Sequence, residues 1–121
     1  MTINIEAYRQ SYQARLQRSL EKREAGRKKA LEEVKAVAPA IAAKYPAIKT
    51  VYLFGSILRP GAFRADSDID LAVEGGSAED YFALWRELQE AIPGWLIDLR
   101  DLPSGTLFTH RVHETGEKIH G

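Results

Sequence analysis

The chain has 121 residues, of which 45% are hydrophobic and 28% charged, and its net charge is zero, which predicts a single soluble globular domain. It contains no cysteine, which excludes disulfides, thiolate catalysis and zinc–thiolate sites. No apolar run approaches the roughly 20 residues that span a bilayer, and Met1–Glu6 lacks a secretory-signal pattern, so we expect a cytoplasmic protein without a membrane partner.

A long helix is predicted from Asn4 to about Val37. Its first half has large apolar side chains at three- and four-residue steps, which is the spacing of one helical stripe: Ile5, Tyr8, Tyr12, Leu16 and Leu20. Residues 21–29 have no large apolar side chain, so we expect them to project into solvent. Pro39 is predicted to end or kink the helix, or to start a new one at Ala40.

The same N-terminal segment is basic. Residues 1–38 hold nine Lys/Arg against five Asp/Glu, and because the whole chain is neutral the remainder is acidic. We therefore expect an N-terminal helical arm, 1–38, followed by the main domain, 39–121. The arm's stripe fits packing on the domain, contact with a partner protein, or a homodimer through this helix.

The main domain, 39–121, is predicted to contain alternating strands and helices. Ser77 followed by Asp80 is a capping-box start for a helix that Pro93-Gly94 closes. Strands and a last helix are predicted from residue types and periodicity at 49–54, 68–74, 95–100 and 108–119. His110 and His113 lie three apart on that last helix without an evident third metal ligand. This order predicts an α/β (α+β) domain with a short mixed sheet flanked by helices.

Two aspartates stand out in the second predicted strand. Asp68 and Asp70 are two residues apart, so both side chains point to the same face. Two neighbouring carboxylates repel each other, and a divalent cation between them offsets the repulsion. The alternative is the polar face of a solvated edge strand.

Asp98 lies inside the third predicted strand, between Ile97 and Leu99. An acid in an apolar strand is unfavourable unless it is paired or binds metal. Asp98 is therefore a candidate third metal ligand beside Asp68 and Asp70. Arg100, two positions along on the same face, is a competing salt-bridge partner for Asp98.

The first predicted strand ends at Gly55-Ser56. A glycine lets backbone N–H groups approach a phosphate closely, and the serine hydroxyl adds a donor. Arg59 and Arg64 in the following loop have the charge to neutralise a triphosphate, although loop solvation also accounts for them. Gly-Ser after a strand, a loop and then Asp-x-Asp is together a much more specific pattern than either part alone.

These segments, Leu53-Phe54-Gly55-Ser56, Arg59 and Asp66–Val73, resemble the signature of the polymerase β-like nucleotidyltransferases. The group most similar is the minimal nucleotidyltransferases, the antitoxin partners of HEPN proteins, and the resemblance spans about residues 41–101. It implies the nucleotidyltransferase fold, with Asp68, Asp70 and Asp98 as catalytic, metal-binding carboxylates. It also implies nucleotide binding by Gly55, Ser56 and Arg59, two Mg²⁺ ions (or Mn²⁺), and ATP as substrate.

By this resemblance the expected reaction is transfer of AMP to a tyrosine hydroxyl of a HEPN-type toxin. The chain is too short to include an additional domain for a bulky acceptor, which favours a protein acceptor over nucleic acid. Two other functions stay open. One is a non-catalytic antitoxin module that binds NTP or its partner and acts by docking alone. The other is a small-molecule nucleotidyltransferase that works as a homodimer.

Overall fold

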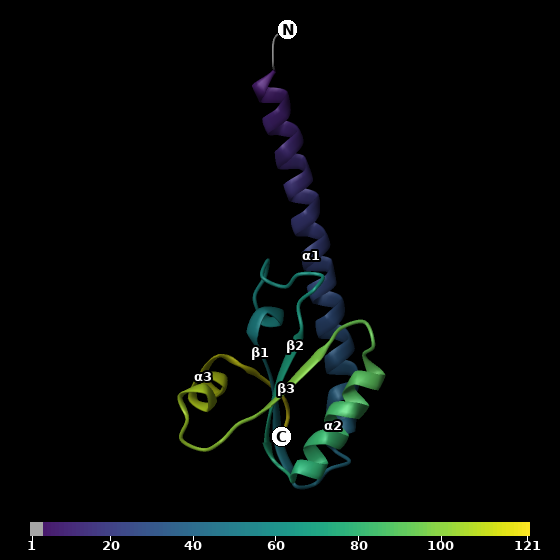
Figure 1. The fold of residues 1–121 in the computed structure, drawn as a ribbon, viewed down its shortest axis with the longest axis vertical. Helices are drawn as coiled ribbons and strands as arrows, with labels where there is room; N and C mark the ends of the chain where they lie inside the picture. Colours follow the sequence, from purple (N-terminus) through teal and green to yellow (C-terminus); the bar gives the residue numbers. More distant parts are fainter. Residues whose placement is uncertain (1–3) are drawn as a thin grey trace.

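The computed structural model describes residues 4–121, so the first three residues of the predicted arm lie outside it. Figure 1 shows a small α/β body from which one long helix extends. In chain order the elements are α1 (Ile5–Ala42), β1 (Ile48–Phe54), the 3-10 turn η1 (Gly55–Leu58), β2 (Ile69–Gly75), α2 (Ala78–Ala91), β3 (Ile97–Asp101), α3 (Leu107–Thr115) and β4 (Glu117–His120).

Helix α1 is longer than the sequence predicts. It begins after Asn4, whose side chain accepts a hydrogen bond from the Ala7 N–H at 3.0 Å. It then continues through Pro39 to Ala42 instead of ending near Val37. Ala38 and Ala42 on either side of the proline are buried, so packing on the domain offsets the backbone hydrogen bond that Pro39 cannot make.

The four strands form one mixed sheet in the order β3-β2-β1-β4. Strand β2 is antiparallel to β1 and parallel to β3, with α2 as the crossover between the parallel pair. The capping box predicted at the start of α2 is confirmed, because Ser77 and Asp80 exchange both side-chain-to-backbone hydrogen bonds.

The last predicted helix, 108–119, is wrong in its last third. Helix α3 ends at Thr115, and residues 117–120 form β4, antiparallel to β1. Gly116 is the turning point, and a Cβ there would lie 2.6 Å from the Val112 carbonyl oxygen and 3.0 Å from that of Leu53. Only glycine allows this close return of the chain to the sheet, and no periodic signal marks it.

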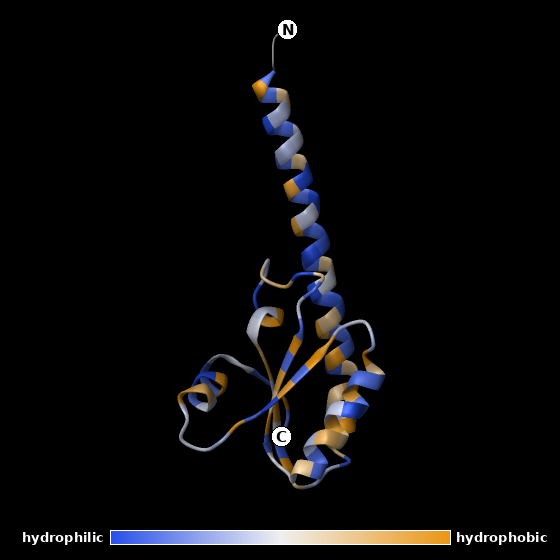
Figure 2. Ribbon diagram, in the orientation of Figure 1, coloured by the Kyte–Doolittle hydropathy of each residue, from blue (hydrophilic) through white to orange (hydrophobic). Residues whose placement is uncertain are grey.

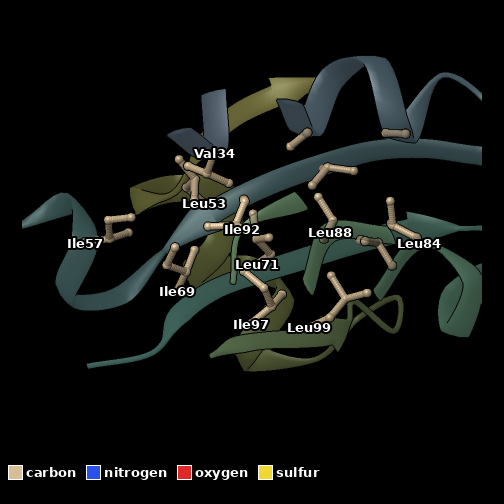
Figure 3. Close-up of a cluster of buried hydrophobic side chains, with 14 of the residues drawn as sticks. Val34, Leu53, Ile57, Ile69, Leu71, Leu84, Leu88, Ile92, Ile97 and Leu99 are labelled. Atoms are coloured by element: carbon tan, nitrogen blue, oxygen red, sulfur yellow. The ribbon is translucent and has the colours of Figure 1, made fainter. Parts of the chain in front are cut away.

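The sheet separates two apolar layers. The larger lies between the sheet and helices α1 and α2, and Figure 3 shows residues of both helices meeting Leu53, Leu71 and Leu99 from the strands. The smaller lies on the other face, where Ala72, Leu102 and Val112 pack with aromatic side chains of β1 and α3. No helix among residues 4–121 is long and apolar enough to cross a membrane.

The C-terminal third of α1 is part of the larger layer, as Ala30, Val34, Ala38 and Ala42 are all buried. Replacing Ala38 with leucine is expected to overpack this contact and to lower the free energy of unfolding by roughly 1–3 kcal/mol. Ala36→Leu, at an exposed position of the same helix, is the matched control and is expected to have little effect. Equal urea-unfolding curves for the two variants would contradict the packing of α1 described here.

Candidate active site

The parallel register of β2 and β3 brings Asp70 and Asp98 side by side. The two residues are direct partners in the ladder, so their side chains project from the same face of the sheet. This is the face covered by α3, because the next inward residue of β2 on it is Ala72, in the smaller apolar layer. Asp68 precedes β2, which begins at Ile69, and its side chain is exposed.

Asp70 is the most strongly perturbed acid of the site. Burial raises its pKa to about 6, and the charge of Asp98, a hydrogen bond with Asp98 and the charge of Asp68 act in the same direction. The charge of Arg100 opposes them. Asp70 therefore holds a proton more readily than a free aspartate does, as expected for a partly buried carboxyl beside like charges.

Arg100 contacts Asp98 as the sequence suggested. Its guanidinium lies 3.5 Å from Asp98 Oδ2, and it also lies over the ring of Phe108 in α3, 5.8 Å from the ring centre. Arg100 is exposed and Asp98 is partly exposed, so the ion pair adds little stability. Asp98 therefore interacts with both Arg100 and Asp70.

The Gly55-Ser56 turn lies directly against Asp70. Gly55 has φ +80°, a conformation that favours glycine, and a Cβ at this position would lie 2.5 Å from Asp70 Oδ2. The backbone after β1 therefore passes next to the carboxyl pair. Ser56 is half-buried in this turn, whereas Arg59 and Arg64 are exposed on the loop that follows.

Helix α1 holds that loop in place, contrary to the expectation that residues 21–29 project freely into solvent. Arg27 forms an ion pair with Glu24 and donates a hydrogen bond to the Ile57 carbonyl at 3.1 Å. The Gly61 N–H donates to Glu24 Oε2 at 3.2 Å. Glu24 and Arg27 are three apart on one helix face, but their link to a loop thirty residues away leaves no trace in the sequence.

Helix α2 fixes the edge strand that carries Asp98. Trp85 Nε1 donates to the Ile97 carbonyl at 2.9 Å, and Tyr81 donates to the Leu99 carbonyl. Gln89 accepts from the Ile97 N–H at 2.9 Å. Within the described residues no further strand pairs with this edge of β3. The three side chains therefore form the hydrogen bonds of the backbone groups on both sides of Asp98.

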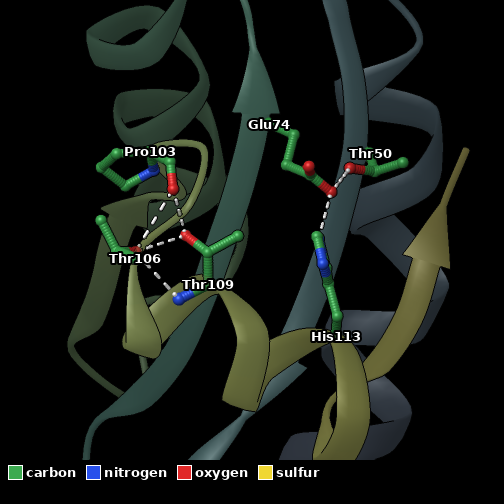
Figure 4. A network of polar contacts seen from close by, with 6 residues as sticks. All are labelled: Thr50, Glu74, Pro103, Thr106, Thr109 and His113. Atoms are coloured by element: carbon green, nitrogen blue, oxygen red, sulfur yellow. Dashed lines mark hydrogen bonds and ion pairs between the residues drawn. The ribbon is translucent and has the colours of Figure 1, made fainter.

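On the other side, α3 is tied to the sheet by polar contacts that the sequence does not reveal (Figure 4). Glu74 Oε1 accepts from Thr50 at 2.8 Å and lies 2.9 Å from His113 Nε2. The Thr109 hydroxyl donates to the Pro103 carbonyl at 2.6 Å. These contacts position Phe108 beneath Arg100.

Asp70 and Asp98 form a pair of oxygen donors that suits a divalent cation. Within residues 4–121 no group of three or more His, Cys, Asp and Glu side chains is arranged to hold a metal ion, so the three predicted carboxylates are not assembled around one point. Asp70 and Asp98 do meet, and their mutual repulsion is relieved by a cation. Mg²⁺ usually binds through one or two carboxylates together with substrate phosphates, and this pair beside a glycine turn is such a set.

Comparisons with known proteins show the family and the fold of this chain. The family model described as polymerase beta, nucleotidyltransferase matches residues 36–121, which contain every residue of the candidate site. Among solved structures, a toxin-antitoxin with AMP-PNP is 28% identical, with a TM-score of 0.57 over 74% of this chain and 73% of that one. A mutant toxin-antitoxin MntA-HpeT is 24% identical, with a TM-score of 0.59 over 72% and 73%, and shares the fold. No curated protein matches the chain.

The raised pKa of Asp70 has a measurable consequence for stability. The folded state keeps the Asp70 proton up to about pH 6, whereas the unfolded chain releases it near 3.8, so stability falls as the pH rises through this window. Asp70→Asn removes the free-energy cost of ionising this carboxyl in the folded state, which is about 1 kcal/mol after allowance for solvent screening. We therefore expect the variant to raise Tm at pH 7.5 by roughly 3–5 °C.

Thermal unfolding in EDTA at pH 7.5 and pH 5 tests this prediction. The gain from Asp70→Asn should be smaller at pH 5. Asp101→Asn changes the same group on the opposite face of β3 and serves as the control, with little change expected. A lower Tm for Asp70→Asn at pH 7.5 would contradict the described environment of Asp70.

Proposed function

Since this chain belongs to the polymerase beta nucleotidyltransferase family, as its resemblance to minimal nucleotidyltransferases predicted, we propose that it transfers AMP from ATP to a hydroxyl of a partner protein. The chain is a nucleotidyltransferase; the nucleotide, the metal and the acceptor are what we propose. The observation that carries the proposal is the Asp70–Asp98 pair beside the Gly55 turn.

Gly55 and Ser56 are proposed to bind the phosphates of ATP. The left-handed Gly55 leaves backbone N–H groups of the turn accessible where a side chain would block them, and the half-buried Ser56 hydroxyl adds a donor. Arg59 is exposed at the end of η1, where its guanidinium can reach the outer phosphates. These groups orient the triphosphate over the carboxyl pair.

Asp70 and Asp98 are proposed to hold the catalytic metal, with the exposed Asp68 as the third carboxylate at the entrance. Mg²⁺, in two ions by resemblance and with Mn²⁺ as a substitute, neutralises triphosphate charge when it is bound. Asp98 accepts the proton of the attacking hydroxyl. The acceptor oxygen forms a bond to the α-phosphorus, the bond to the bridging oxygen breaks, and pyrophosphate leaves.

The proposed acceptor is a tyrosine hydroxyl of a HEPN-type toxin, which would make this chain the antitoxin of the pair. Support comes from the 28% identical solved structure, which is a toxin-antitoxin with AMP-PNP, an ATP analogue. The open position of the carboxyl pair, with Asp98 partly exposed and Asp68 exposed, also suits a macromolecular acceptor that approaches from solvent.

Incubation with a HEPN-type toxin, ATP and Mg²⁺ is expected to add AMP to the toxin, seen as a mass gain in intact-protein mass spectrometry. Asp70→Asn and Asp98→Asn should each slow the transfer by about 100-fold or more, since each removes a group that acts on charge developing in the transition state. Asp101→Asn, on the opposite face of β3, should retain the activity. No mass gain with ATP, GTP, CTP or UTP would refute the proposal.

The same variants separate catalysis from neutralisation by docking alone. If Asp70→Asn still folds and binds the toxin but no longer protects cells against it, the protection depends on nucleotidyl transfer. If protection is intact, the chain acts by docking.

A further inference from the structure

The N-terminal half of α1 is an exposed arm with an apolar stripe. Ile5, Tyr8 and Tyr12 are 66%, 71% and 61% exposed, and Leu16 and Leu20 continue the stripe toward the domain. Figure 2 shows a few hydrophobic segments spaced along the otherwise largely hydrophilic N-terminal half of α1. Large side chains spaced to form one face, with nothing packed on them among residues 4–121, mark a contact surface rather than a solvated helix.

The stripe lies on the same face of α1 as the residues that pack on the domain. Tyr12, Leu16 and Leu20 each precede a buried residue, Ala30, Val34 and Ala38 respectively, by 18 positions. At about 3.6 residues per turn this separation is a whole number of turns. Figure 1 shows the arm leaving the body at the end where the loops after β1 and before β2 lie. The stripe therefore extends past the end of the sheet near which Asp70 and Asp98 lie, although these two carboxylates project from the other face of the sheet.

A basic cavity of about 580 Å³ lies at the corner between arm and body. Lys22 and Arg23 line it from α1, and Arg64 lines it from the loop that follows Ser56. Phe63 and Trp95, which belong to the apolar layer beneath α1 and α2, form its wall. None of the three cations forms an ion pair within residues 4–121, and they outnumber Asp66, the one acid in the lining of this cavity, so the corner presents net positive charge to whatever enters it.

We propose that the stripe and this cavity together form the docking surface, or seat, for the acceptor protein. The occupant would be a protein helix whose apolar face lies along the arm and whose acidic residues enter the corner cavity. The seat rests on the proposed function for the identity of its occupant, and it explains how a hydroxyl on that protein is delivered to the end of the sheet where Asp70 and Asp98 lie.

The positive charge and the apolar stripe of this surface favour an acidic protein helix over a second copy of the chain and over nucleic acid. A second copy of the chain would bring two arms together, each with Arg15, Arg18 and the cations of the corner free of ion pairs within the described residues, and these would repel. Nucleic acid would satisfy the cations but would leave Leu16 and Leu20 against sugar and phosphate. An acidic, amphipathic helix satisfies both the stripe and the cavity.

The absence of cysteine makes a direct test simple. Leu16→Cys carries the only thiol of the chain, and a photoactivatable maleimide attached there is expected to cross-link a HEPN-type toxin co-expressed with the full chain. The control is Gln10→Cys, at an exposed position away from the stripe, and it should not cross-link the toxin. A cross-link from Leu16→Cys to a second copy of the chain or to RNA, or no cross-link, would overturn the proposal.

A kinetic readout separates this proposal from the proposed function. Tyr12→Ser with Leu16→Ser should raise the KM for the toxin about tenfold or more, whereas Gln10→Ser with Ala14→Ser, away from the stripe, should leave it unchanged. If AMP is transferred but the stripe variant has an unchanged KM, the seat is refuted and the function stands. If the cross-link forms and no AMP is transferred, the function fails and the seat stands.

Discussion

Two carboxylates held in register on adjacent parallel strands are the constraint on which the rest of the site depends. Asp70 and Asp98 face each other because β2 and β3 are joined through α2, which makes them parallel neighbours. The contact is unfavourable for the free protein, because burial and then the charge of Asp98 both raise the pKa of Asp70. The arrangement becomes favourable when a cation and a phosphate-bearing substrate bind beside the two carboxylates. An unfavourable pair of this kind is therefore typical of a functional site.

The surrounding structure supports this pair from three sides. The Gly55 turn closes over Asp70, α2 satisfies the edge of β3 around Asp98, and α3 places Phe108 under Arg100. Helix α1 acts at longer range: its C-terminal third packs in the core, its middle holds the loop after Ser56, and its N-terminal half is exposed. One continuous helix therefore links the site to a surface suited to a partner.

The sequence predicted the parts of the protein that depend on local patterns. The strands around Asp70 and Asp98, the Ser77–Asp80 capping box and the long first helix follow from periodicity and capping chemistry. It missed β4 and the link from Arg27 to Ile57, because both depend on contacts between distant segments. It also grouped Asp68 with Asp70 as strand neighbours, although β2 begins only at Ile69, so Asp68 lies outside the ladder that pairs Asp70 with Asp98.

A crystal structure of the chain with Mn²⁺ and a non-hydrolysable ATP analogue would test the central claim most directly. Anomalous scattering locates manganese without assumptions about the ligands. The account predicts manganese between the carboxylates of Asp70 and Asp98, with the triphosphate against the Gly55-Ser56 turn. Manganese away from both carboxylates, or a nucleotide bound in the cavity beside Lys22 and Trp95, would contradict it.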